Sequence, residues 1–290
     1  MKKPHNLKTK IFLDGGDPRE TREIIALLGF LDGQTTNPTL IAKSPDAKKR
    51  LAEGKKFTEE ETTAFYRGIV HELSGLIPDG SISIEVYADR CCTSSDAMLK
   101  QGREMFSWIK NAHIKYPTTA EGLAAAEQSV REEMRVNMTL CFTEEQAAAV
   151  YAATRGAKAG GVFVSPFVGR LDDIGENGMD LIENILRLYR AGDGHAEVLS
   201  ASVRNMQHFM RALELGSDII TAPFSILKEW GEKEMPIPGK DFSYAPEGLR
   251  AIPYRDLDLS LDWKTFPIAH PLTDKGIDRF SEDWNALIEK

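Results

Sequence analysis

One lysine of this 290-residue chain occupies a position from which it can do covalent chemistry. Lys115 lies near the end of the apolar, strand-like segment Ala112–Tyr116. A lysine amine adds to a carbonyl only when it is deprotonated, and burial disfavours the charged ammonium form. Lys115 is therefore a candidate Schiff-base nucleophile. The simpler alternative is a lysine at the protein rim with its ammonium group in water, and for a lone lysine that alternative is the more common.

Two carboxylates end other strand-like segments. Asp14 ends one of them and can act as a general base on a substrate hydroxyl, although two glycines follow it and aspartate before glycine is typical of a turn. Glu85 stands between two apolar residues, and charged side chains are seldom buried without a partner. If Glu85 points inward, we expect Lys115 to be its partner. If it points outward, it is a solvated surface group.

Hydroxyls and arginines follow two later segments. Ser165, Phe167 and Arg170 belong to one run, and Ser202 and Arg204 follow the next strand-like segment. Arginine offers two parallel donors to a phosphate, so this pattern favours a phosphorylated ligand. Either arginine alone is more commonly a surface salt-bridge partner. Combined with a nucleophilic lysine, the pattern indicates carbon–carbon chemistry on a sugar phosphate.

Three further polar side chains occupy positions of the same kind. Asn37 precedes Pro38 after the second strand-like segment, where it either contacts a ligand or forms an ordinary turn. Asn137 and Thr139 are two residues apart in an otherwise apolar segment, so both point to the same face. We expect that face to be a polar lumen that serves a ligand, or else a hydrogen-bonded structural network.

The elements that must position these residues are eight strands alternating with helices. Such an order predicts a parallel sheet closed as a (β/α)8 TIM barrel, in which the ends of the strands carry the active site. An open doubly wound sheet is the alternative, but no GxGxxG sequence follows the first strand. The predicted strands are Lys10–Asp14, Gly33–Thr36, Ile82–Tyr87, Ala112–Tyr116, Arg135–Cys141, Gly161–Ser165, Glu197–Ser202 and Asp218–Thr221. Capping boxes predict three helix starts, at Thr58/Glu61, Thr118/Glu121 and Thr143/Gln146.

After residue 230 the alternating pattern ends. Residues 231–290 predict a proline-rich connection followed by a last helix that Thr273 caps. The apolar face of this helix, which we expect to pack on the wall or rim of the barrel, consists of Ile277, Phe280, Trp284, Leu287 and Ile288. Residues 1–290 are thus predicted to form a single barrel domain.

Composition excludes several functional classes. A net charge of −8 favours neither a nucleic-acid nor a membrane partner. The residues from Met1 to Lys10 are polar and basic with no apolar region behind them, so we expect a cytoplasmic protein. Three cysteines, two of them adjacent, form no disulfide framework, and no CxxC or HExxH spacing predicts a metal site. A homo-oligomer is compatible with the sequence, which does not specify its size.

Several motifs resemble those of the transaldolase family, in the order of that family. The resemblance covers about residues 11 to 230, and the final helix is also similar. Its motifs are Leu31-Asp-Gly-Gln-Thr-Thr-Asn-Pro-Thr-Leu-Ile-Ala-Lys43, Ile82-Ser-Ile-Glu-Val86, Ile114-Lys115, Asn137-Met-Thr-Leu140, Val164-Ser-Pro-Phe-Val-Gly-Arg170 and Ala201-Ser-Val-Arg-Asn205. The resemblance implies a metal-free class I aldol transfer on a (β/α)8 barrel, without a cofactor. Its substrates would be sedoheptulose 7-phosphate and glyceraldehyde 3-phosphate, in the pentose phosphate pathway.

The resemblance also implies a role for each candidate. Lys115 would form the Schiff base and Asp14 would deprotonate the substrate hydroxyl, while Glu85 and Thr139 would hold a catalytic water. The dihydroxyacetone portion of the substrate would bind to Asn37, Asn137 and Ser165, and the phosphate to Arg170, Ser202 and Arg204. Two features depart from the family pattern: the glycines after Asp14, and His113 where an apolar residue is usual. For His113 we expect a buried, neutral ring with a hydrogen bond, the alternative being a group that tunes the charge of the lumen.

Two other functions compete with transaldolase. A fructose-6-phosphate aldolase of the same superfamily would release free dihydroxyacetone, but that branch typically has glutamine at the position of Glu85 and tyrosine at that of Phe167. A non-catalytic barrel that binds sugar phosphates would have lost catalytic groups, and this chain retains Lys115, Asp14 and Glu85. Phe167 is also a candidate substrate-binding residue, because an aromatic ring beside the intermediate excludes water.

Overall fold

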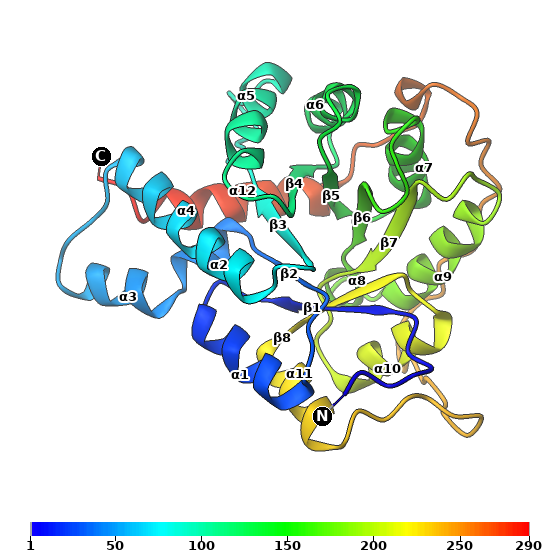
Figure 1. Cartoon of the computed structure of the whole chain (residues 1–290). Helices are drawn as coiled ribbons and strands as arrows, with labels where there is room; N and C mark the ends of the chain where they lie inside the picture. The colour runs from blue at the N-terminus through cyan, green and yellow to red at the C-terminus, as the bar shows by residue number, and fades with distance from the viewer. Residues whose placement is uncertain (1, 290) are drawn as a thin grey trace.

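Eight parallel strands close into a barrel in the computed structural model, which describes residues 2–289 (Figure 1). Each strand pairs with the next along the chain, and the eighth pairs with the first. The strands are β1 (Lys10–Asp14), β2 (Gly33–Thr35), β3 (Ser81–Glu85), β4 (Ala112–Pro117), β5 (Val136–Cys141), β6 (Val162–Pro166), β7 (Ala196–Ser200) and β8 (Ile219–Pro223). All eight predicted strands are confirmed, with ends within two residues of the predictions.

Helices cover the outside of the barrel, and two of the connections carry additional helices. Helices α2 to α4 all lie between β2 and β3, and α8 and α9 both lie between β6 and β7. The helices up to β8 are α1 (Pro18–Leu28), α2 (Pro38–Ala42), α3 (Pro45–Ala52), α4 (Glu59–Leu76), α5 (Ser95–Phe106), α6 (Ala120–Arg131), α7 (Glu144–Ala153), α8 (Val168–Asp172), α9 (Gly178–Tyr189) and α10 (Met206–Leu215). The (β/α)8 fold predicted from the alternating pattern is therefore confirmed.

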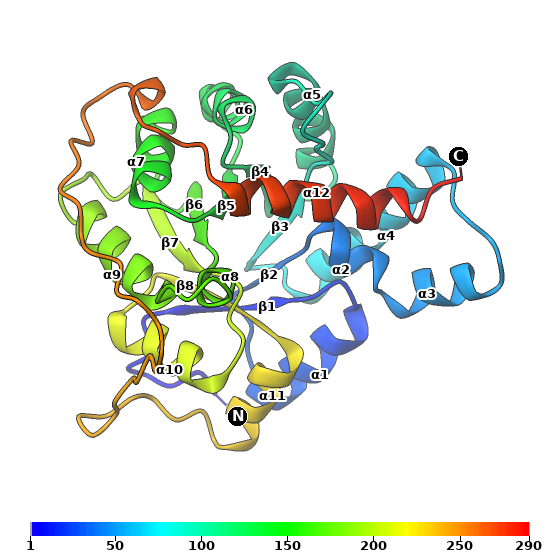
Figure 2. The ribbon, with the colours of Figure 1, turned by 180° about the vertical axis from the view of Figure 1, so that it is seen from behind.

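The chain after β8 runs back over the barrel. It forms α11 (Phe224–Glu232), a long connection with one 3-10 turn η1 (Trp263–Thr265), and α12 (Pro271–Asn285). Figure 2 shows α12 lying across the barrel, where it packs on α2 and on β5. Of the five predicted face residues, Ile277, Phe280, Trp284 and Leu287 are buried and Ile288 is partly buried. The apolar face of α12 thus covers the barrel as its spacing predicts.

The lower part of the barrel lumen is filled by aromatic rings. Phe12 meets Phe163 edge to face, with centroids 5.9 Å apart, and Phe163 stacks on His113 at 4.0 Å. Gly33 on β2 leaves room for this layer, since a Cβ there would lie 2.5 Å from the ring of Phe12. The layer closes the bottom of the barrel, so only the C-terminal ends of the strands are left to hold a ligand.

His113 is a structural residue of this layer. Its Nδ1 accepts a hydrogen bond from the Ser81 hydroxyl (2.7 Å) and its Nε2–H donates to the Gly160 carbonyl (3.0 Å), the tautomer being assigned from these partners. Burial lowers the pKa of His113 to about 3. The prediction of a buried, neutral, hydrogen-bonded histidine is therefore confirmed.

The helix caps partly match the sequence predictions. The capping box of Thr58 and Glu61 is confirmed. Thr143 accepts from the Gln146 amide as predicted, but the Gln146 side chain accepts from the Phe142 amide rather than from that of Thr143. The predicted box at Thr118 is wrong. Thr119 is the N-cap of α6, because the Thr118 hydroxyl donates instead to the Thr139 carbonyl at 2.8 Å.

The predicted cap of the last helix is also wrong. α12 begins three residues earlier than Thr273 would allow, with His270 as the N-cap and Pro271 in the first turn. Proline fits that position because its fixed φ suits a helix start and it has no amide hydrogen to satisfy. Thr273 instead donates to the Leu140 carbonyl at 2.9 Å, which ties α12 to the end of β5. Among residues 2–289, no helix combines the length and apolar character that crossing a membrane requires.

Candidate active site

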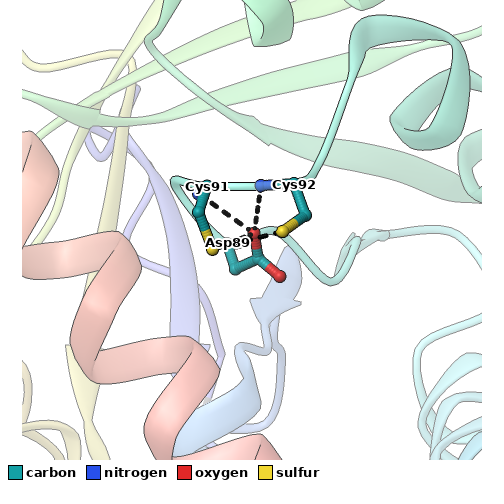
Figure 3. A group of neighbouring side chains, drawn as sticks. All are labelled: Asp89, Cys91 and Cys92. Carbon is teal, nitrogen blue, oxygen red and sulfur yellow. Dashed lines mark hydrogen bonds between the residues drawn. The ribbon is translucent and has the colours of Figure 1, made fainter.

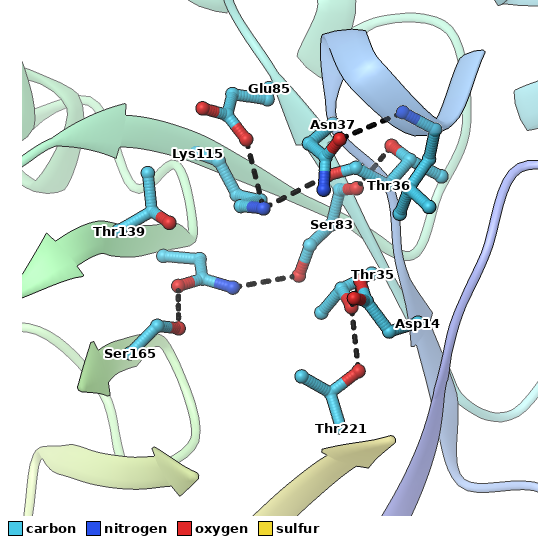
Figure 4. Close-up of polar contacts among 12 residues, drawn as sticks. Asp14, Thr35, Thr36, Asn37, Ser83, Glu85, Lys115, Thr139, Ser165 and Thr221 are labelled. Atoms are coloured by element: carbon cyan, nitrogen blue, oxygen red, sulfur yellow. Dashed lines mark hydrogen bonds and ion pairs between the residues drawn. The ribbon is translucent and has the colours of Figure 1, made fainter. Parts of the chain in front are cut away.

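Lys115 and Glu85 form a buried ion pair at the C-terminal ends of β4 and β3. Lys115 Nζ lies 2.9 Å from Glu85 Oε2, and each side chain is 5% exposed (Figure 4). The two residues are direct partners in the parallel register of the two strands, so the pairing is a consequence of barrel closure. The sequence prediction that an inward Glu85 meets Lys115 is thus confirmed. Lys115 Nζ also donates to the Thr36 carbonyl at 2.9 Å, which fixes its position in the lumen.

Tyr66 on α4 forms hydrogen bonds with the two chain segments that hold this ion pair. The Thr36 hydroxyl donates to the Ser83 carbonyl (2.8 Å), so it accepts the hydrogen of the Tyr66 hydroxyl (2.6 Å). The Tyr66 oxygen in turn accepts the amide hydrogen of Glu85 at 3.0 Å. Burial raises the pKa of Tyr66 beyond its usual range, so the phenol stays neutral. Tyr66 therefore locks the strand segments that carry both Glu85 and the carbonyl acceptor of Lys115.

Burial also affects the acidity of Glu85. Removal from water raises the pKa of this carboxyl, and the nearby charges of Lys115 and then Arg170 act in the opposite direction. A carboxyl in this balance exchanges a proton more readily near neutral pH than a solvated glutamate does. The pair can therefore supply a nucleophilic amine and a proton carrier within one hydrogen-bond length.

Asp14 lies across the lumen from this pair. Its Oδ1 accepts a hydrogen bond from the Thr35 hydroxyl at 2.8 Å, and Thr35 meets Thr221 at 2.6 Å. Burial raises the pKa of Asp14, against the lowering effects of the Lys115 charge and of the Thr35 hydroxyl. A carboxylate held in this way, facing the amine but not paired with it, is placed to take a proton from a ligand bound between them.

The wall between β3 and β6 carries a buried polar chain. Asn137 donates to the Ser83 hydroxyl at 3.0 Å, and Ser165 donates to Asn137 Oδ1 at 2.6 Å. Thr139 is also fully buried, and its hydroxyl has no hydrogen-bond partner among the described residues. A buried hydroxyl without a partner is costly, so Thr139 offers a site for a ligand group or a water.

A cavity of about 270 Å³ contains Lys115 and opens at the C-terminal end of the barrel. Eight of the eleven predicted site residues line it, namely Asp14, Asn37, Lys115, Thr139, Ser165, Phe167, Arg170 and Ser202. Glu85 and Asn137 do not line this cavity but contact residues that do. Asn37 is also the N-cap of α2, because its side chain accepts from the Leu40 amide at 2.9 Å, so it has a local structural role, as a helix cap and not a turn, beside its place in the cavity wall.

Cationic side chains gather at the mouth of this cavity. Arg170 is mostly buried there, with its guanidinium 5.3 Å from the Phe167 ring and 5.5 Å from the Phe280 ring. Burial lowers the pKa of Arg170 against the raising effect of the Glu85 carboxylate, and the neighbouring guanidinium groups of Arg204 and Arg279 add smaller lowering effects. Arg204 and Arg279 are each paired with a carboxylate, Asp173 and Asp283, whereas Arg170 forms no ion pair among residues 2–289 and is open to an anion. The mouth is therefore suited to a phosphate.

Ser202 and Arg204 occupy the loop after β7. Ser202 lines the cavity and adopts φ 56°, a conformation that costs energy for a residue with a side chain. Its carbonyl accepts from the Gly169 amide at 3.0 Å, which holds this conformation. Arg204 does not line the cavity: it makes two hydrogen bonds of 2.6 Å to Asp173, and both side chains are about half exposed. Arg204 must leave Asp173 to reach a ligand in the cavity.

The profile of the family described as transaldolase/fructose-6-phosphate aldolase matches residues 11–290. The chain belongs to this family. It is 36% identical to a probable transaldolase of Thermoplasma volcanium and to one of Thermoanaerobacter, and 34% identical to one of Dehalococcoides mccartyi. These matches cover 95–96% of this chain and 96–99% of each relative. Membership in the transaldolase/fructose-6-phosphate aldolase family identifies the chain as an enzyme of the aldolase or transferase kind.

Some residues of the candidate active site were not predicted from the sequence. Arg279 and Lys43 line the cavity that contains Lys115, and neither is among the predicted site residues. Arg279 lies off the predicted apolar face of α12, so an amphipathic pattern alone assigns it to solvent. The one signal in the sequence was that Arg279 directly precedes Phe280, a residue of the predicted apolar face. In the structure both residues line the cavity. Tyr66 was also missed, because it lies in the middle of a helix and is distant in the sequence from any predicted strand end.

Proposed function

We propose that the chain is a transaldolase that transfers a dihydroxyacetone unit through a Schiff base on Lys115. The observation that carries the proposal is the Lys115–Glu85 pair at 2.9 Å, facing Asp14 in a cavity whose mouth is cationic. The donor is sedoheptulose 7-phosphate and the acceptor is glyceraldehyde 3-phosphate. The products are erythrose 4-phosphate and fructose 6-phosphate.

In this mechanism the Lys115 amine attacks the ketose carbonyl carbon, and the carbonyl oxygen leaves as water. Glu85 carries the protons of this step through a water that the unpaired Thr139 hydroxyl holds. Asp14 then takes the proton of the substrate hydroxyl, the adjacent carbon–carbon bond breaks, and its electron pair moves into the iminium. Departure of the product aldehyde leaves an enamine on Lys115, which adds to the acceptor aldehyde as Asp14 returns the proton. Water then attacks the new iminium, with Glu85 carrying the protons, so that the carbon–nitrogen bond breaks and the ketose product and the free Lys115 amine are released.

The remaining candidates bind the sugar in this proposal. Asn37, Asn137 and Ser165 hydrogen-bond the dihydroxyacetone portion. Arg170, Ser202 and Arg204 hold the phosphate, and Arg279 from α12 adds a third guanidinium to that end of the cavity. For Arg204 this requires exchanging Asp173 for the phosphate. That exchange is favourable because the Arg204–Asp173 pair is exposed, and exposed pairs contribute only about 0–1 kcal/mol.

Phe167 favours transfer over release, the reaction of a fructose-6-phosphate aldolase. Its ring lines the cavity, supplies no proton to the enamine and excludes water from it. The enzyme is therefore incubated with fructose 6-phosphate, with and without erythrose 4-phosphate, and free dihydroxyacetone is assayed. We expect little dihydroxyacetone without the acceptor and a heptulose phosphate with it. Phe167→Tyr, which introduces a hydroxyl, should increase release. Rapid release by the wild type without acceptor would show that the chain is an aldolase instead.

A further inference from the structure

Two adjacent cysteines form an exposed dithiol in the loop between β3 and α5, outside the cavity that contains Lys115. The sulfurs of Cys91 and Cys92 lie 3.3 Å apart (Figure 3). Asp89 lies against them, with Oδ1 3.5 Å from Cys91 Sγ. Within residues 2–289, these side chains are the one group of three cysteine, histidine or acidic residues close enough together to hold a metal ion.

Backbone hydrogen bonds of this loop hold the Asp89 carboxylate against the two cysteines before any ligand binds. Asp89 Oδ1 accepts the amide hydrogens of Cys92 at 2.7 Å and of Cys91 at 3.2 Å. The amide of Asp89 donates to the Thr93 hydroxyl at 2.9 Å. The donor atoms therefore start close together, and less conformational entropy is lost when they bind one ion.

We propose that Asp89, Cys91 and Cys92 bind a single thiophilic divalent cation of the zinc class. Two thiolates and a carboxylate are ligands that zinc accepts. Two sulfurs bound to one tetrahedral zinc lie about 3.8 Å apart, as Zn–S bonds of about 2.3 Å require. The observed separation is 3.3 Å, so the thiols need to open by only a fraction of an ångström.

The surroundings leave room for a fourth ligand. Both cysteines and Asp89 line a cavity of about 520 Å³, which shares no lining residue with the cavity of Lys115. A zinc with three protein ligands keeps its fourth position for water or a small ligand. The cavity has room for such a ligand beside the three side chains. The cation is therefore separate from the aldol chemistry, which uses Lys115.

A disulfide between the two cysteines is the competing use of the dithiol. Cα atoms of adjacent residues are about 3.8 Å apart across a trans peptide, whereas disulfides usually join Cα atoms about 4.4–6.8 Å apart. An adjacent disulfide therefore requires a distorted backbone. A bound cation needs only the small opening of the two thiols, so the geometry favours the cation.

The test is a cation titration of the full chain, reduced and then freed of metal with a chelator. Cd²⁺, which absorbs in the ultraviolet when thiolates bind it, is added as the probe, and Zn²⁺ is then added to displace it. We expect the absorption to saturate at one Cd²⁺ per chain. Cys91→Ser and Cys92→Ser should each weaken binding by about tenfold or more. Asp89→Asn should also weaken it, although asparagine keeps an oxygen to accept both amide hydrogens.

Cys141→Ala is the matched control, because this thiol is buried at the end of β5 and its loss should leave Cd²⁺ binding unchanged. Circular dichroism of each variant verifies the fold. The proposal is overturned if the wild type gives no thiolate absorption, if binding does not saturate at one equivalent, or if the two serine variants bind like the wild type. It is also overturned if the reduced protein, kept under mild reductant, forms an adjacent disulfide detected by mass spectrometry.

Discussion

At the scale of single residues, the mouth of the cavity is defined by guanidinium groups in different surroundings. Arg170 is mostly buried between two aromatic rings, whereas Arg204 is about half exposed and bound to Asp173. Within residues 2–289 Arg170 forms no ion pair with a carboxylate and is therefore ready for an anion, while Arg204 must first leave Asp173. These surroundings predict that the two arginines contribute unequally to the binding of a phosphorylated substrate.

Arg170→Ala should raise the KM for fructose 6-phosphate by about tenfold or more, because it removes charge-assisted hydrogen bonds of about 1.5–3 kcal/mol. Arg204→Ala should raise the KM less, and Asp173→Asn should lower it by freeing Arg204. Steady-state kinetics of the three variants measure these effects. Lys228→Ala is the control, because Lys228 is exposed and pairs with Glu23 on α1. Equal KM values for Arg170→Ala and the wild type would show that the phosphate binds elsewhere.

At the scale of elements, α12 closes one side of the candidate active site through a very close approach. A Cβ added at Gly276 would lie 2.5 Å from a Leu140 methyl carbon and 2.8 Å from Arg170 Nη1. A side chain at this position would force the ends of the Leu140 and Arg170 side chains to move. The same approach brings Arg279 and Phe280 into the wall of the cavity.

Gly276→Ala should therefore displace the guanidinium of Arg170 and the Leu140 side chain. Overpacking of this kind costs about 1–3 kcal/mol, partly offset by the higher helix propensity of alanine. We expect a lower free energy of unfolding in urea and a higher KM for phosphorylated substrate. Gly68→Ala in α4 is the matched control, since a Cβ there meets nothing within 4 Å and should stabilise the helix by about 0.5–1 kcal/mol. Identical behaviour of the two variants would mean that α12 does not position Arg170.

The elements also show how far the sequence predicts this molecule. The strands and the Lys115–Glu85 pair were predictable, because apolar runs place strands and parallel register then aligns their ends. The caps at Thr118 and Thr273 were wrong because each hydroxyl has a tertiary acceptor, the carbonyls of Thr139 and Leu140. The Arg204–Asp173 pair and the place of Arg279 depend on how loops and α12 pack on the barrel. Local sequence spacing does not contain that information.

At the scale of the whole molecule, the barrel has a closed aromatic base and an ionisable top. Neutral His113 belongs to the base, where it stacks on Phe163, and the carboxyl groups of Asp14 and Glu85 belong to the top. As the pH falls, His113 and the two carboxyl groups change the free energy of unfolding in opposite directions. Burial lowers the pKa of His113, so the folded protein resists protonation of this ring in acid. Burial raises the pKa values of Asp14 and Glu85, so the folded protein favours their protonated forms.

The pKa of His113 is about 3 in the folded protein and about 6.5 in an unfolded chain. Between these values the unfolded state binds more protons, so His113 contributes stability that is lost as the pH falls from about 6.5 toward 3. His113→Phe keeps the ring but cannot titrate. Its free energy of unfolding should be lower at neutral pH, because it lacks the bonds to Ser81 and Gly160, yet should fall less steeply with acid. Urea unfolding across this range measures both slopes, and parallel slopes would contradict the assignment.

The central claim, covalent catalysis by Lys115, is tested most directly by trapping the intermediate. Sodium borohydride is added to the enzyme with fructose 6-phosphate, and the modified peptide is located by mass spectrometry. We predict a reduced dihydroxyacetone adduct on Lys115 and none in Lys115→Arg, which keeps the charge but cannot add to a carbonyl. An adduct on another lysine, or an unmodified wild-type enzyme that still turns over, would contradict the Schiff-base mechanism proposed for this chain.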